Sequence, residues 1–179
     1  TINDYFGSLG CKTDTLYLSN VEVKREELNK KIESADIIYV GGGNTAYMMK
    51  VWQKYAVDKA LMKAYKSGKV LSGLSAGSIC WFIAGHCDSE FIEGKENPKH
   101  KWVKGLGIIP YLHCPHYDEP ERADFDEFYS GQIADAIALE NQVAIVWDDY
   151  EMKVIKSNPH KNAYHLSWSD KGLNKEVLF

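Results

Sequence analysis

The sequence has no long hydrophobic run. No stretch approaches the roughly 20 consecutive apolar residues that a membrane-spanning helix needs, and residues 1–4 lack the charged and apolar regions of a secretory signal peptide. Blocks of basic residues are missing too: Lys and Arg never form a run longer than a pair, and the net charge is −4. These absences argue against a membrane as partner and against a nucleic acid as partner.

Cysteine and arginine are both scarce. The four cysteines form no Cys-x-x-Cys pair, which predicts free thiols and a reducing, cytoplasmic location. The segments His86-Cys87-Asp88 and His113-Cys114-Pro115-His116 contain metal-ligand types, but no helical His-Glu-x-x-His spacing organises them. We therefore expect no metal site. Arg25 and Arg122 are the two arginines of the chain.

With 179 residues, of which 45% are hydrophobic, the chain is long enough for one sizeable core, and we expect a single domain over residues 1–179. The sequence starts with Thr1, and little of it precedes the first clear αβ unit. We therefore expect that N-terminal strands of the domain are missing. Nothing in the composition indicates the oligomeric state, and a monomer or a homodimer is the expectation.

Apolar periodicity indicates an α/β fold. The run 35–40 is short, apolar and rich in β-branched residues, as in a strand buried on both faces of a parallel sheet. Strands and helices alternate with short links, which calls for right-handed crossovers and helices on both faces of the sheet. We expect strands at 15–18, 35–40, 69–74, 108–112, 143–147, 152–155 and 164–168, helices at 23–34, 44–55, 58–67 and 79–83, an irregular loop at 85–104, and mixed helical signals at 124–139.

Gly73-Leu74-Ser75-Ala76-Gly77 fits the pattern G-x-S-x-G. In a nucleophile elbow this pattern places a serine on a strained strand-to-helix turn that only small flanking residues permit. A strand is expected before the motif and a helix after it, as the elbow requires. Ser75 is therefore the candidate nucleophile, and the alternative is a tight turn in which Ser75 only caps a helix.

A serine hydroxyl needs a base within hydrogen-bond reach and a group that fixes the tautomer of that base. His116 is the candidate base, because it follows an apolar run whose end would face the same crevice as Ser75. Asp88 lies between the two in the chain and is the candidate orienting acid. Glu90 and Glu93 are competitors, and each of these three carboxylates could instead be a solvated loop residue.

The glycines that follow the strand 35–40 supply a candidate oxyanion hole. Glycine lets a backbone N–H approach a substrate oxygen closely, and a loop that opens a helix presents unpaired donors. The N–H of Gly42 or Gly43 would act together with that of Ala76, the residue after the nucleophile. The alternative, a phosphate-binding loop, lacks both the P-loop pattern and an acidic residue placed as in a dinucleotide-binding site.

Three motifs together, Val40-Gly41-Gly42-Gly43-Asn44-Thr45, Gly73 to Ser78 and Cys114-Pro115-His116-Tyr117, resemble the peptidase E family of serine peptidases, which includes aspartyl dipeptidases and cyanophycinases. The resemblance covers nearly the whole chain. It implies a three-layer αβα domain with a mostly parallel sheet, similar to the class I glutamine amidotransferase domain, and a Ser-His-Asp/Glu triad without metal or organic cofactor. It also implies cleavage of short peptides after an N-terminal aspartate, so a small peptide is the expected partner.

The resemblance leaves the substrate open. Family members usually begin with further strands and a helix, and the loop after His116 is short and acidic compared with the aspartyl dipeptidases. Asn44, beside the glycines, and Arg122, six residues after His116, are candidate substrate-binding residues, since arginine grips a carboxylate with two hydrogen bonds. A surface arginine is the alternative for Arg122. Two other functions stay open: a catalytically silent relative that binds a metabolite, and an amidotransferase-like domain, which Ser75 disfavours because that group uses cysteine.

Overall fold

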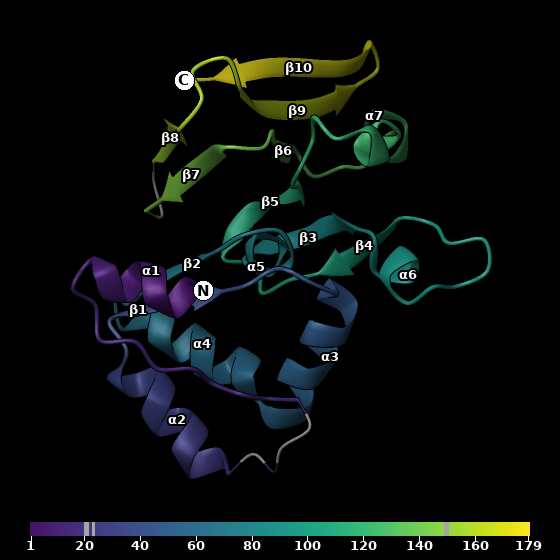
Figure 1. Cartoon of the computed structure of the whole chain (residues 1–179). Helices are drawn as coiled ribbons and strands as arrows, with labels where there is room; N and C mark the ends of the chain where they lie inside the picture. The colour runs from purple at the N-terminus through teal and green to yellow at the C-terminus, as the bar shows by residue number, and fades with distance from the viewer. Residues whose placement is uncertain (20–21, 23, 149–150) are drawn as a thin grey trace. The chain divides into compact units, whose positions relative to one another are not determined.

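The computed structural model describes residues 1–19, 22, 24–148 and 151–179 (Figure 1). The chain separates into two compact units: the first comprises Thr1–Ile38 and Lys50–Leu71, and the second comprises Tyr39–Met49 and Ser72–Phe179. Within the described residues, no helix is both long and apolar enough to cross a membrane.

The first unit is mainly helical. It contains α1 (Ile2–Ser8), α2 (Arg25–Ser34) and α4 (Val57–Lys66). Thr1 caps α1, because its hydroxyl accepts a hydrogen bond from the N–H of Asp4 while the Asp4 carboxylate bonds back to the chain start. Helices α2 and α4 pack together through their apolar faces. The residues buried along these two helices are Leu28, Ile32, Val57, Leu61 and Ala64.

Strands β1 (Ile37–Val40) and β2 (Val70–Gly73) form a two-stranded sheet. The N–H of Val70 bonds to the carbonyl of Asp36, and the N–H of Leu74 bonds to that of Val40. The partners advance in the same direction along both strands, so the pair is parallel. Helix α3 (Thr45–Tyr55) follows the glycines after β1. The predicted strands 35–40 and 69–74 and the predicted helices 23–34, 44–55 and 58–67 are confirmed, although Val23 lies outside the described residues.

The second unit is built on a six-stranded sheet with the order β10-β9-β6-β5-β3-β4. Its strands are β3 (Phe82–Cys87), β4 (Lys101–Lys104), β5 (Ile109–Cys114), β6 (Ala136–Leu139), β9 (Ala163–Ser169) and β10 (Gly172–Leu178). The pairs β3–β5 and β5–β6 are parallel, whereas β3–β4, β6–β9 and β9–β10 are antiparallel. The α/β class is confirmed, but this sheet is mixed rather than mostly parallel.

Short helices connect these strands: α5 (Ala76–Ile79), α6 (Ser89–Ile92), the 3-10 helix η1 (Pro120–Arg122) and α7 (Phe125–Phe128). Strands β7 (Val143–Trp147) and β8 (Met152–Lys156) form a separate antiparallel hairpin. Both of its strands were predicted. The residues Asp148-Asp149-Tyr150 also indicate a turn between them, and residues 149 and 150 lie outside the described residues.

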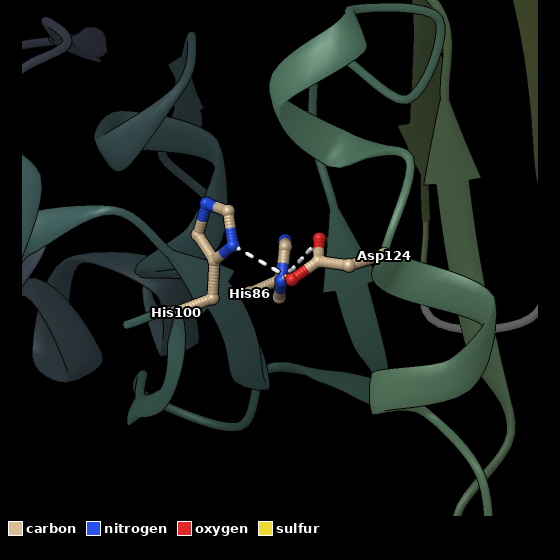
Figure 2. Close-up of side chains that lie close together, drawn as sticks. All are labelled: His86, His100 and Asp124. Carbon is tan, nitrogen blue, oxygen red and sulfur yellow. Dashed lines mark hydrogen bonds and ion pairs between the residues drawn. The ribbon is translucent and has the colours of Figure 1, made fainter. Parts of the chain in front are cut away.

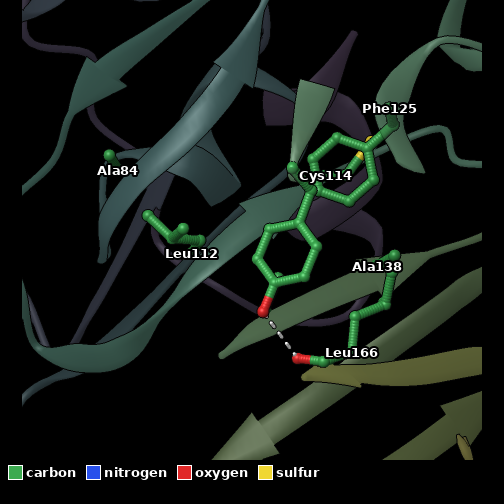
Figure 3. Close-up of a cluster of buried hydrophobic side chains, with 8 residues drawn as sticks. Ala84, Leu112, Cys114, Phe125, Ala138 and Leu166 are labelled. Carbon is green, nitrogen blue, oxygen red and sulfur yellow. Dashed lines mark hydrogen bonds between the residues drawn. The ribbon is translucent and has the colours of Figure 1, made fainter. Parts of the chain in front are cut away.

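The core of the second unit lies where α7 packs on the sheet (Figure 3). Phe125 and Tyr129 are fully buried, and the single hydroxyl hydrogen of Tyr129 faces two acceptors, the backbone carbonyls of Ala134 and Leu166, each at 3.1 Å. A buried tyrosine hydroxyl with two acceptors avoids the cost of an unsatisfied polar group. The other members of the cluster are Ala84, Leu112, Cys114, Ala136, Ala138 and Leu166.

Four predicted segments are wrong. Residues 15–18 are irregular, because a strand needs a pairing partner that a local pattern cannot show. The predicted helix 79–83 ends at Ile79 and gives way to β3. The predicted loop 85–104 holds the end of β3, helix α6 and strand β4, and Gly85 fits there because a Cβ would lie 2.7 Å from Ile79. The helical signals at 124–139 divide into α7 and β6.

Candidate active site

Ser75 occupies a strained turn between β2 and α5. Its backbone has φ 55° and ψ −119°, a conformation that non-glycine residues seldom adopt. The flanking glycines make the turn possible: a Cβ on Gly73 would lie 2.3 Å from the carbonyl oxygen of Gly77, and a Cβ on Gly77 would lie 2.0 Å from that of Val40. Both distances are far below van der Waals contact. The G-x-S-x-G pattern therefore corresponds to a turn that only these glycines allow.

Two backbone segments border the Ser75 side chain. Ala76 is the first residue of α5, and N–H groups in the first turn of a helix have no acceptor within the helix. On the other segment, a Cβ on Gly42 would lie 3.2 Å from the Ser75 Cβ and 3.7 Å from its Oγ. Gly43 follows with φ 134°, which favours glycine. The predicted oxyanion residues thus lie beside the predicted nucleophile.

His116 lies two residues beyond β5 and is partly buried, with 25% of its side chain exposed. Its Nδ1 is 2.8 Å from the amide oxygen of Asn141, and the Asn141 amide nitrogen donates to a carboxylate oxygen of Glu119 at 2.9 Å. An amide oxygen only accepts hydrogen bonds, so the neutral His116 ring carries its proton on Nδ1. Its Nε2 is therefore an acceptor, as a general base requires.

Asn141 was missed in the sequence. It follows β6, which runs parallel to β5, so His116 and Asn141 lie beyond the carboxyl ends of neighbouring parallel strands. The signal was present, because the polar pair Glu140-Asn141 comes directly after the apolar run of β6. The assignment of that run to a helix concealed it.

Asp88 lies against Arg122 rather than His116. Its carboxylate is 2.9 Å from an Arg122 guanidinium nitrogen, and the Arg122 side chain is 4% exposed. The sequence predicted that Arg122 faces the substrate or the surface, whereas in the structure it is buried. The sequence also predicted that Asp88 lies beside His116, whereas in the structure it pairs with Arg122. The described structure also shows no hydrogen bond between Ser75 Oγ and the His116 ring. Catalytic hydrogen bonds are often long before substrate binds.

The remaining predicted residues lie around helix α6. Glu90 contacts lysines, and its hydrogen bond to Lys95 above all lowers its pKa to about 2. Glu93 accepts a hydrogen bond from the Asn44 side-chain nitrogen at 3.0 Å. The Asn44 side-chain oxygen accepts a hydrogen bond from the N–H of Tyr47, so Asn44 caps α3. Asn44 therefore ties the segment of the predicted oxyanion glycines to the end of α6 in this structure.

A second serine and histidine pair is completely formed three residues away from the first. Ser78 Oγ lies 3.0 Å from Nε2 of His113, whose Nδ1 is 2.8 Å from the carbonyl of Ile137. The same hydroxyl lies 2.7 Å from the Ser75 carbonyl. His113 is fully buried, and this burial lowers its pKa to about 4.

These features define an α/β protein with a serine on a strained strand-to-helix turn after β2 and, beyond β5 of the six-stranded sheet, a histidine with the tautomer that a general base requires. The family model of peptidase family S51 matches residues 1–155. The chain belongs to this family and is a serine-type peptidase, which confirms the family resemblance of the sequence motifs.

Three proteins illustrate the similarity. The chain is 30% identical over 169 residues to the uncharacterized peptidase YgaJ of Bacillus subtilis strain 168, covering 92% of this chain and 70% of that protein. It is 27% identical over 93 residues to peptidase E of Streptomyces coelicolor, covering 51% of this chain and 36% of that protein. A crystal structure assigned to a peptidase E protein of Listeria monocytogenes EGD-e has a TM-score of 0.68 at 20% identity, over 87% of this chain and 76% of that chain.

Proposed function

We propose that this chain hydrolyses short peptides through an acyl-enzyme formed on Ser75, with peptides that carry an N-terminal aspartate as the first class to test. The backbone conformation of Ser75 carries the proposal, because a strained φ at the tip of a strand-to-helix turn holds a side chain away from its own backbone, as in a nucleophile elbow. Such strain persists only when the surrounding structure maintains it, and here Gly73 and Gly77 allow the backbone around Ser75 to pack closely enough to form the turn.

In the proposed reaction, His116 Nε2 takes the hydroxyl proton while Ser75 Oγ bonds to the substrate carbonyl carbon. The carbonyl oxygen becomes an oxyanion, which the N–H groups of Ala76 and of Gly42 or Gly43 stabilise. The imidazolium then gives its proton to the leaving amine, and the amine departs. Water, deprotonated by the same nitrogen, releases the acid and restores Ser75.

The orienting group differs from the one that the sequence predicted. We propose Asn141, backed by Glu119, because the Asn141 oxygen is 2.8 Å from His116 Nδ1 and a Glu119 oxygen lies 3.5 Å from the same atom. The carboxylate stabilises the imidazolium that forms during the reaction, and the amide fixes the tautomer. Asp88 remains the alternative acid from the sequence.

The finer description of the fold and setting belongs to the same proposal. We expect a single peptidase domain with a three-layer αβα arrangement similar to class I glutamine amidotransferases, working in the cytoplasm as a monomer or homodimer on small peptides. A catalytically silent relative is the second candidate, and the missing hydrogen bond between Ser75 and His116 favours it.

A fluorophosphonate probe separates the two candidates, since it reacts with activated serines only. We expect wild-type protein to gain one probe adduct, which peptide fragmentation mass spectrometry places on Ser75 rather than Ser72 or Ser78. A screen against dipeptides with Asp, Asn or neutral N-terminal residues then defines the substrate. If the folded protein is not labelled, the remaining proposal is a catalytically silent protein that binds a metabolite.

A further inference from the structure

Arg122 is a buried cation whose partners come from the strand β3 and the residue after it. One guanidinium nitrogen bonds to Asp88 at 2.9 Å, and another lies 3.3 Å from His86 Nδ1 and 3.4 Å from the His86 carbonyl oxygen. Desolvating a charge is costly unless it is paired and hydrogen-bonded. The position of Arg122 is therefore tightly tied to the end of β3.

The contact with Arg122 also decides the state of His86. Arginine only donates hydrogen bonds, so His86 Nδ1 accepts and its Nε2 carries the proton. That nitrogen lies 3.6 Å from a carboxylate oxygen of Asp124, whose other oxygen is 3.0 Å from Nδ1 of His100 (Figure 2). Burial has the largest effect on His86 and lowers its pKa to about 3, so the ring is neutral at pH 7.

The group in Figure 2 has side-chain types that bind metals, but its tautomer disfavours one. The ligand atoms of His86, His100 and Asp124 lie within 4.8 Å of one another. A metal ion at this position would need a lone pair on His86 Nε2. Because Nδ1 accepts the hydrogen bond from Arg122, Nε2 carries the proton and offers no lone pair. The three residues instead extend the polar network of Arg122 toward the protein surface.

On its backbone side, Arg122 is joined to the proposed base by two successive turns. The N–H of Glu119 bonds to the His116 carbonyl at 2.9 Å, and the N–H of Arg122 bonds to the Glu119 carbonyl at 2.9 Å. Between these turns, the Glu119 side chain reaches Asn141 and the His116 ring. His116 itself has φ 56°, a conformation that its surroundings must enforce.

We infer that the Asp88–Arg122 ion pair positions the His116 base by anchoring the turn 116–122 to the end of β3. This inference rests on the proposed function and gives Asp88 and Arg122 a role other than triad acid or substrate contact. Both are positioning residues, which act through Glu119 and the backbone of the turn. A misplacement of catalytic groups by about 1 Å can cost roughly 100-fold in rate.

The test compares two carboxylates that have similar exposure and similar distances to their partners. Asp88 and Asp135 are 39% and 43% exposed, and each lies 2.9 Å from its cationic or histidine partner, Arg122 or His165. The rate of fluorophosphonate labelling is measured against probe concentration, giving a maximal rate, kinact, and a half-saturating concentration, KI. We expect Asp88→Asn to lower kinact about 10- to 100-fold with KI unchanged, whereas Asp135→Asn changes neither.

Further variants separate the pair from a direct role of Asp88. Arg122→Lys keeps the buried charge but loses the fork, so it should lower kinact as Asp88→Asn does. The double variant should be no slower than the single ones, because both changes break one interaction. Asp88→Glu, which keeps the carboxylate, should recover most of the rate. If circular dichroism shows that Asp88→Asn does not fold, Arg122→Lys still tests the ion pair.

Equal kinact for Asp88→Asn, Asp135→Asn and wild type would overturn the inference while leaving the proposed function intact. A loss in Asp88→Asn alone, with Arg122→Lys at the wild-type rate, would also overturn it and make Asp88 the triad acid. A rise in KI or a change in the ratio of Asp-X to Asn-X dipeptide hydrolysis in Arg122→Lys would assign Arg122 to the substrate. Unlabelled wild-type protein refutes the proposed function first.

Discussion

Among the described residues, two combinations of a serine and a histidine invite comparison, and they differ in hydrogen bonding, in backbone conformation and in the burial of the histidine. Ser78 and His113 are joined at 3.0 Å, with Ser78 partly buried, His113 fully buried and the far ring nitrogen held by a backbone carbonyl. Ser75 and His116 share no hydrogen bond in the described structure, yet Ser75 sits on a strained turn and His116 is partly exposed. A good hydrogen bond by itself therefore does not identify a catalytic pair. Our proposal of Ser75 and His116 rests on the strained turn, on the partly exposed histidine and on the backbone N–H groups beside Ser75.

The Ser78 hydroxyl explains why its pair is structural. It has one hydrogen and faces two acceptors, the Ser75 carbonyl at 2.7 Å and the His113 nitrogen. His113 stacks on Phe82 with ring centroids 4.1 Å apart, and burial keeps it neutral. We therefore propose that the pair holds the backbone behind Ser75 and has a structural role.

The largest expected effect breaks the comparison at the serines. Ser75→Ala should lower kcat by about 10⁴-fold or more, because the nucleophile is lost while a small side chain still fits the turn. Ser78→Ala should cost about 1 kcal/mol of stability through a lost hydrogen bond and leave kcat within an order of magnitude. The measurements are hydrolysis of the best dipeptide and urea unfolding. More than a tenth of the activity in Ser75→Ala contradicts the assignment.

The next effect concerns the group behind the base. Asn141→Leu removes the acceptor for His116 Nδ1–H and should lower kcat about 100-fold with little change in KM, since the wrong tautomer becomes accessible. Asn141→Asp keeps an acceptor and should retain most activity. Asn162, which is also partly buried and bonds through its side chain, supplies the control in Asn162→Leu. Equal activities of the two leucine variants would return the role to Asp88.

The smallest effect concerns the structural histidine. The folded-state pKa of His113 is about 4, below the ordinary value of 6.5, so between these values the unfolded chain binds the extra proton. The corresponding stability is complete above pH 6.5 and is lost as the pH falls toward 4, by about 2 kcal/mol at pH 5. We expect His113→Asn to reduce the difference in unfolding free energy between pH 7 and pH 5 by that amount.

The control for this titration is His160→Asn, because His160 is exposed. Urea unfolding at the two pH values measures both variants. An unchanged pH dependence in His113→Asn would show that His113 is not held neutral by its surroundings, and would weaken the division between the two histidines.

Sequence patterns located the parts of the site that depend on local backbone. Ser75, Gly42 and Gly43 lie at turns whose backbone geometry can be predicted from their glycines, and His116 follows an apolar strand. The partner of His116 could not be found in the same way, because it depends on which strand neighbours β5. Once residues 124–139 are divided into α7 and β6, Asn141 lies at the correct edge.

The ion pair between Asp88 and Arg122 was the other feature that the sequence could not predict. Asp88 and Arg122 are 34 residues apart, and either could face solvent by composition alone. Arg122 is buried against the end of β3, and β3 forms through its pairing with β4 and β5, whereas the sequence around Gly85 and His86 was predicted to be a loop. The helices, by contrast, follow from periodicity, because their apolar faces repeat within a few residues.

The close packing of Gly73 and Gly77 has a consequence for comparing family sequences. Both glycines meet backbone oxygens, of Gly77 and Val40, whether or not Ser75 reacts. We expect a relative without activity to keep both glycines, since any side chain there disrupts the turn. Another small residue in place of Ser75 would keep the turn and lose the hydroxyl. The two glycines four positions apart should therefore indicate the architecture, while the residue midway between them should indicate whether the proposed chemistry is retained.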